Sequence, residues 1–123
     1  MRNKESKGYH KLILWQKLQE LLKIVYRLTE SLPRSEEYGL KSQMRRAMVS
    51  VISNFVEGYM KKSVKEKQHF LEIAETSLLE LEAQSEICLI LNYWSDSDYE
   101  LIDNKRGETG YFLYKYRSAI KNP

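Results

Sequence analysis

The stretch that decides the fold is KSQMRRAMVSVISNFVEG, residues 41 to 58. On a helix, at about 100° per residue, Arg46, Ser50, Asn54 and Glu57 fall within about 80° of one another. Apolar side chains fill most of the remaining circumference, so most of this helix must be buried. The narrow polar stripe must then find partners, because an unpaired polar group is costly to bury.

Two interpretations of this polar stripe follow. The first is a buried polar network or subunit contact, with Ser77, Glu80 and Gln84 as the expected partners on a neighbouring helix. The second is a surface that contacts a ligand or a nucleic acid. A satisfied buried network can fix helix register and oligomeric state, and it is the preferred interpretation.

Helical spacing of apolar residues extends on both sides of this stretch and predicts a single domain over residues 1–123. Pro33 ends the first helix, Ser63 and Ser97 cap the third and fourth, and Gly107 with Gly110 weakens or breaks the last. Short connections make successive helices antiparallel, so the expected fold is an all-α, up-and-down four-helix bundle. The expected helices cover about residues 9–31, 36–60, 64–93 and 97–120.

Composition excludes several classes of protein. No window of the 123 residues approaches the length of uninterrupted apolar sequence that a spanning helix needs, so we expect no membrane association. The N-terminus lacks the apolar core of a signal peptide, which predicts a cytoplasmic location. Cys88 is the only cysteine and lies in an apolar run, so we interpret it as a small buried hydrophobic residue.

Catalytic and metal-binding motifs are missing from the sequence. It contains no Gly-rich phosphate loop, no nucleophile elbow and no Cys/His ligand cluster. The pair Glu66 and His69 has the spacing used in di-iron bundles, but such sites need two pairs and further carboxylates. We therefore expect no catalytic residue, no metal and no cofactor, and the protein is not expected to be an enzyme.

The net charge of +3 hides an uneven distribution. Residues 1–67 hold 15 Lys or Arg and 7 Asp or Glu, whereas residues 68–100 hold no basic and 8 acidic residues. One interpretation is neutralisation between neighbouring helices or subunits; the other is a basic surface that attracts nucleic acid. The candidate nucleic-acid-binding residues are Lys41, Arg45, Lys61, Lys62, Lys65 and Lys67, joined by an N-terminal arm with Arg2, Lys4, Lys7 and Lys11.

Residues 42–58 follow the pattern S-Q-M-R-R-A-x-x-S-x-x-S-N-x-x-E-G. Shorter motifs accompany this pattern: Trp15-Gln16-Lys17, Leu32-Pro33, Tyr38-Gly39-Leu40 and Phe70-Leu71-Glu72-Ile73-Ala74. Together these motifs resemble the bacterial four-helix-bundle family that is encoded in intervening sequences of 23S ribosomal RNA genes. The resemblance implies a compact helical bundle, often assembled as a ring-like homopentamer.

Two functions are compatible with these observations. The leading hypothesis is a non-enzymatic protein that associates with RNA or the ribosome through basic clusters repeated around a ring. The alternative is a protein-interaction scaffold or accessory subunit without RNA contact of its own, with grooves lined by Tyr111, Tyr114 and Tyr116. Bundles that serve as accessory partners of reverse transcriptases are similar to this chain in expected architecture.

Overall fold

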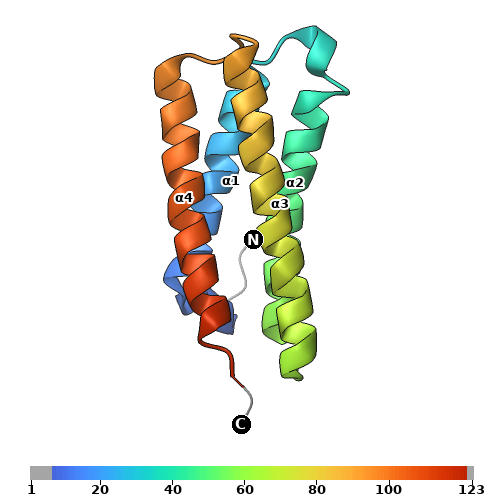
Figure 1. Ribbon diagram of the computed structural model, residues 1–123, viewed down its shortest axis with the longest axis vertical. Coiled ribbons are helices and arrows are strands. Elements are labelled where there is room, and N and C mark those ends of the chain that lie inside the picture. The colour runs from blue at the N-terminus through green and yellow to red at the C-terminus, as the bar shows by residue number, and fades with distance from the viewer. Residues whose placement is uncertain (1–6, 122–123) are drawn as a thin grey trace.

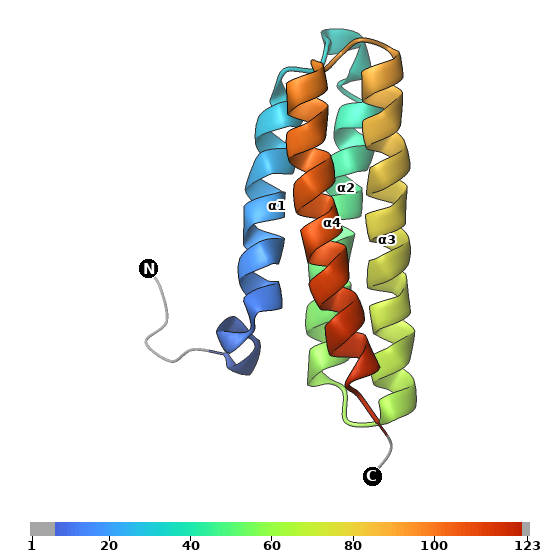
Figure 2. The same cartoon turned by 60° about the vertical axis from the view of Figure 1, so that its left-hand side comes forward.

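Four long helices run alternately up and down (Figure 1 and Figure 2). The computed structural model describes residues 7–121, and within that range every regular element is helical, which confirms the all-α fold. Short 3-10 turns, η1 (Gly8–Lys11) and η2 (Arg34–Glu36), precede the first and second helices. The helices are α1 (Ile13–Glu30), α2 (Leu40–Met60), α3 (Val64–Ile90) and α4 (Asp96–Ser118).

The main contacts join α1 to α2, α2 to α3, α3 to α4 and α4 to α1. The helices α1 and α3 therefore lie across the diagonal of the bundle. The connections between α1 and α2 and between α3 and α4 lie at one end. The turn between α2 and α3, the start of α1 and the end of α4 lie at the other (Figure 1).

Apolar side chains at helical spacing fill the centre of the bundle. They include Leu18, Leu21 and Val25 from α1 and Met48 and Phe55 from α2, all fully buried. The indole of Trp94 is also buried and donates its N–H to the carbonyl of Leu28 at 3.0 Å, which satisfies both groups inside the core. Core burial of this kind supplies most of the stability of amphipathic helices.

Two helices begin later than predicted. The expected first turn of the first helix is the separate turn η1, and Leu12 with φ −79° and ψ 140° interrupts the chain before α1 starts. The second helix starts at Leu40 instead of residue 36, because residues 34–36 form η2. The Glu36 carboxylate then accepts the Leu40 N–H at 3.0 Å, at the start of α2.

Two details at the ends of α3 and α4 differ from the prediction, and a third decides between the two alternatives for the last helix. Ser63 caps α3 as predicted, accepting the Glu66 N–H at 3.0 Å, but α3 ends at Ile90. Asn92 there has φ 59°, the left-handed conformation that terminates many helices. Ser95, and not Ser97, caps α4, and α4 continues without a break through both of its glycines.

Candidate nucleic-acid interface

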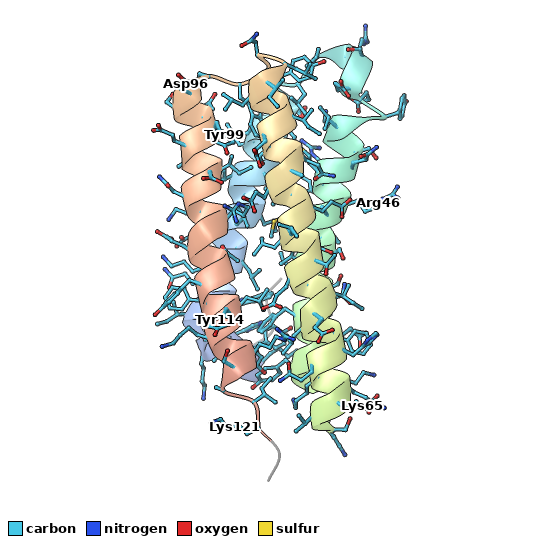
Figure 3. All side chains as sticks on the ribbon, viewed as in Figure 1. Arg46, Lys65, Asp96, Tyr99, Tyr114 and Lys121 are labelled. Carbon is cyan, nitrogen blue, oxygen red and sulfur yellow. The ribbon has the colours of Figure 1, made fainter. Side chains whose placement is uncertain are left out.

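The predicted lysines at residues 61–67 lie together at the turn between α2 and α3. Lys61 has extended backbone, and Ser63 then restarts the chain as α3, so the turn projects side chains beyond the helix ends. Lys62 and Lys65 are exposed, and Figure 3 shows Lys65 at this end of the bundle. Neither side chain takes part in an ion pair with another residue of the described range 7–121.

Two other segments bring basic residues to the same end of the bundle. The turn η1 carries Lys11 and is preceded by Lys7, and its Gly8 lies against the Tyr59 hydroxyl near the end of α2. The chain after α4 carries Lys121, which Figure 3 places at the same end of the bundle as Lys65. We call this surface the basic end, and its exposed lysines are Lys7, Lys11, Lys62, Lys65 and Lys121. Arg2 and Lys4 of the predicted N-terminal arm lie outside the described residues.

Acidic side chains near the basic end are largely engaged by partners. Arg117 of α4 pairs with Glu72 at 2.9 Å and with Glu75 at 3.0 Å, both on α3. Glu57 lies 3.8 Å from Lys61, and the Glu66 carboxylate accepts the Ser63 hydroxyl at 3.1 Å. Neutralisation between neighbouring helices, as the charge pattern predicted, therefore occurs beside the exposed lysines and leaves them a local positive excess.

Lys67 has a structural role instead of an exposed one. Its ammonium donates to the carbonyl oxygen of Tyr59 at 2.8 Å and to that of Gly58 at 3.4 Å. These are among the last carbonyls of α2, which lack partners within the helix, so the lysine stabilises the negative end of that helix. Lys61 is half-buried and lies over the Phe70 ring, 5.3 Å from its centroid.

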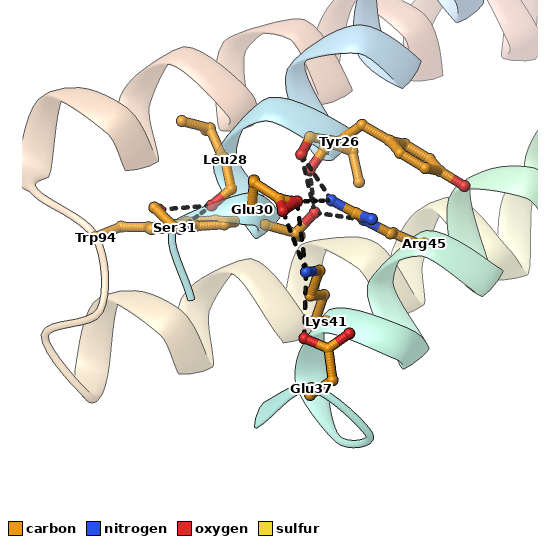
Figure 4. A network of polar contacts seen from close by, with 10 residues as sticks. Tyr26, Leu28, Glu30, Ser31, Glu37, Lys41, Arg45 and Trp94 are labelled. Atoms are coloured by element: carbon orange, nitrogen blue, oxygen red, sulfur yellow. Dashed lines mark hydrogen bonds and ion pairs between the residues drawn. The ribbon is translucent and has the colours of Figure 1, made fainter. Parts of the chain in front are cut away.

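Lys41 and Arg45 lie far from the other predicted lysines. Arg45 donates to the Thr29 hydroxyl at 2.9 Å and to the Tyr26 carbonyl at 3.0 Å (Figure 4). Both Arg45, at 3.2 Å, and Lys41, at 3.4 Å, pair with Glu30, and their hydrogen bonds hold the pKa of this carboxyl below its usual range. This network ties α1 to α2, about 24 Å along the helix from Lys61.

The polar stripe on α2 is only partly a buried network. The Ser50 hydroxyl hydrogen-bonds to the Ser77 hydroxyl at 2.8 Å, one of the expected contacts across to α3. Asn54 donates to the Ser50 carbonyl at 2.9 Å. Arg46 and Glu57, at the two ends of the stripe, are exposed, whereas Ser50 and Asn54 between them are half-buried. A long-side-chain residue at a helix edge reaches solvent even when shorter neighbours on the same stripe are covered.

Arg46 also lines a shallow pocket of about 330 Å³ between α2 and α3. The other lining residues are Gln43, Ala47, Ser50, Ser77 and Glu80. Gln84, an expected partner of the stripe, is buried, and its side-chain oxygen accepts no hydrogen bond from the described residues. The possibility that this stripe contacts a second subunit stays a prediction.

An aromatic cluster at the basic end is the main feature that the sequence analysis missed. Tyr9 lies edge-on to Trp15 with ring centroids 4.8 Å apart, and Tyr59 stacks on Tyr116 at 6.3 Å. Phe55 contacts the rings of both Tyr59 and Tyr116. The recurrence of aromatic residues one helical turn apart, at 55 and 59 and at 112 and 116, is the only signal that the sequence offers.

Other kinds of site find little support in the described range. Within residues 7–121 there is no group of three or more His, Cys, Asp or Glu side chains that could hold a metal ion. No helix in that range is both long enough and apolar enough to cross a membrane. Burial raises the pKa of the Cys88 thiol to about 12, so it is not a nucleophile at neutral pH.

The fold and this surface define a class: an antiparallel four-helix bundle with an exposed basic end. The sequence profile of the family described as "23S rRNA-intervening sequence protein" matches residues 10–115, and this chain belongs to that family, as its motifs predicted. A protein with unknown function from the S23 ribosomal protein family of Bacteroides thetaiotaomicron VPI-5482 has a similar fold. The TM-score is 0.79 at 22% sequence identity, and the match covers 87% of this chain and 100% of that chain. No curated protein matches this sequence.

Proposed function

We propose that this protein is a non-enzymatic RNA-associated protein that docks structured RNA, such as ribosomal RNA, on the basic end of its bundle. The observation that carries the proposal is the set of exposed lysines that three separate segments bring to one end. Lysines without partner carboxylates attract phosphates and release counterions on binding, so they supply affinity for RNA of many sequences. The family description, which refers to 23S rRNA, supports RNA as the partner.

We also propose that the bundle assembles as a ring. Apolar residues remain exposed at the α1–α2 groove and on α3. Leu22, Tyr26 and Val49 border a groove of about 400 Å³ between α1 and α2, and Leu79 and Ile90 project from the outer side of α3. Two different surfaces that bind each other head to tail form a closed ring when the rotation between copies closes. A pentamer, as the family resemblance implies, would repeat the basic end five times.

Binding of a labelled ribosomal RNA hairpin tests the RNA proposal, measured by fluorescence anisotropy over a range of salt concentrations. The double variant Lys62→Gln/Lys65→Gln removes two phosphate contacts. It should therefore reduce the steepness of the log–log salt dependence by about 1.4 to 1.8. Arg34→Glu is the matched control, because it changes net charge by the same two units at the opposite end of the bundle.

The control variant should bind like the unaltered protein. Equal losses of RNA affinity in the two variants would mean that overall charge, and not the basic end, governs binding. Failure of the unaltered protein to bind at low salt would refute the RNA role. Light scattering on the same samples gives the oligomer mass, and a monomer at assay concentrations would refute the ring.

The scaffold function has its own supporting observation. Tyr111 and Tyr114 are both more than half exposed on α4, and exposed tyrosines are frequent anchors in protein interfaces. Tyr116, the third predicted member, is half-buried, and burial raises the pKa of its hydroxyl. Its ring packs against Phe55 and Tyr59 in the aromatic cluster. Partner binding through these tyrosines would depend weakly on salt, which separates this function from RNA docking.

A further inference from the structure

A groove lies at the basic end, between the start of α1 and the end of α4. Its volume is about 390 Å³. Side chains from Leu12, Ile13, Phe112 and Tyr116 make its walls apolar. The groove arises where the extended backbone at Leu12 interrupts the chain between η1 and α1, so that Ile13 is left 57% exposed.

Positive charge surrounds this apolar groove. Lys11 and Lys115 line it from opposite sides, one from η1 and one from α4, and both are exposed. No side chain caps α1, and its first turn contains no acidic residue, so the positive end of the helix dipole adds to the same potential. Apolar walls flanked by two lysines suit a ligand that combines a flat, uncharged ring with an adjoining anionic group.

We propose that this groove holds one unpaired base of single-stranded RNA, with the adjoining phosphates on Lys11 and Lys115. The inference rests on the proposed function and specifies which form of RNA the basic end prefers. Phe112 and Tyr116 provide ring faces or edges of the kind on which bases pack in single-strand-binding proteins. The groove is at the small end of the usual range for ligand sites, about 300 to 1,000 Å³, which suits one base and not a helical segment.

A base in a continuous duplex is stacked and paired, and it is therefore not available to the groove. The structure thus predicts preference for loops, bulges or single strands, where bases are already free. The lysines of the α2–α3 turn bind phosphates of any RNA, whereas the groove adds discrimination in favour of exposed bases.

Three RNA probes with the same number of phosphates test this inference: a single strand, the same strand with abasic positions, and a duplex. The single strand should bind about tenfold more tightly than its abasic form, because stacking of one base is lost. The variant Ile13→Gln removes an exposed apolar wall without changing charge. It should reduce the difference in affinity between the intact and the abasic strand. Leu91→Gln is the matched control, since Leu91 is 48% exposed at the opposite end of the bundle.

Each outcome decides a different point. Equal binding of the intact and abasic strands would overturn the base-binding groove and leave the proposed RNA function standing. Absence of binding to all three probes would overturn both. Tight binding of anionic lipid vesicles, weakened by Ile13→Gln and without a preference between the RNA strands, would overturn the inference in favour of a lipid ligand. Far-UV circular dichroism verifies that both variants are folded.

Discussion

Alanine at Gly107 should stabilise the protein by about 1 kcal/mol. Gly107 is exposed in the interior of α4, and no atom lies within 4 Å of the position that a Cβ would take. The added methyl group therefore makes no clash. The effect that remains is the difference in helix propensity between alanine and glycine, about 0.8 to 1 kcal/mol. For a domain of 123 residues, this corresponds to an increase in Tm of about 4 °C.

Gly58 provides the matched substitution at a buried position. A Cβ there would lie 3.1 Å from the Leu71 Cγ and 3.2 Å from the Lys67 carbonyl oxygen, which belongs to the α3 backbone. Relieving both contacts requires α3 to move, and overpacking of this kind costs about 1 to 3 kcal/mol. That cost exceeds the gain in propensity, so Gly58→Ala should destabilise the protein by about 1 kcal/mol.

Urea unfolding followed by far-UV circular dichroism measures both free energies of unfolding. The protein concentration must be the same in all samples, because any oligomer makes stability depend on it. Both variants should retain the m-value of the unaltered protein. A loss of stability in Gly107→Ala would refute the continuous α4 helix. A gain in Gly58→Ala equal to that in Gly107→Ala would refute the close approach of α2 and α3.

Three further predictions concern single groups. Asn92→Gly should raise the free energy of unfolding by about 0.5 kcal/mol, because Asn92 has φ 59° and glycine adopts this conformation without strain; denaturant titration checks it. The Cys88 thiol, with its pKa raised to about 12 by burial, should react slowly with a disulfide reagent at neutral pH until urea unfolds the chain. A hydrogen bond from Lys105 lowers the pKa of Glu20, so its stabilising contribution should be present above the unfolded-state pKa and disappear as pH falls through the folded-state value. In the variant Lys105→Met, thermal melts at a series of pH values should show a smaller decrease in stability as the pH falls.

The sequence predicted the helices well where one side of each helix is clearly apolar. The spacing of Leu18, Leu21 and Val25 in the first helix marks the side that is fully buried. The spacing of Ala74, Leu78 and Leu81 marks the buried side of α3 in the same way, and only the first turns of α3 are ambiguous, because apolar residues occur there on several sides. In these turns the adjacent residues Phe70 and Leu71 are both apolar, but Phe70 is half-buried and Leu71 is fully buried. Periodicity cannot choose a face when several faces are equally apolar.

Roles of the basic residues could not be predicted because they depend on tertiary contacts. Arg45 and Lys67 are both basic residues of helices in the sequence. In the structure, Arg45 bridges α1 and α2, while Lys67 caps the end of α2. The groove joins Lys11 and Ile13 to residues about 100 positions later in the chain. No local sequence pattern indicates that these two segments are neighbours, because only the antiparallel order of the helices brings them together.

The small net charge does not argue against the RNA binding that we propose. Arg117 pairs with both Glu72 and Glu75 on α3 and offsets one of their two negative charges, which reduces their effect on the field at Lys62 and Lys65. Screening over about 8 Å at physiological salt further separates the basic end from the acidic residues at the far end of the bundle. In the proposed ring, several basic ends would engage one RNA together, and linked sites bind more tightly than any one alone. Modest charge per subunit is therefore compatible with strong, salt-sensitive docking of RNA by the assembly.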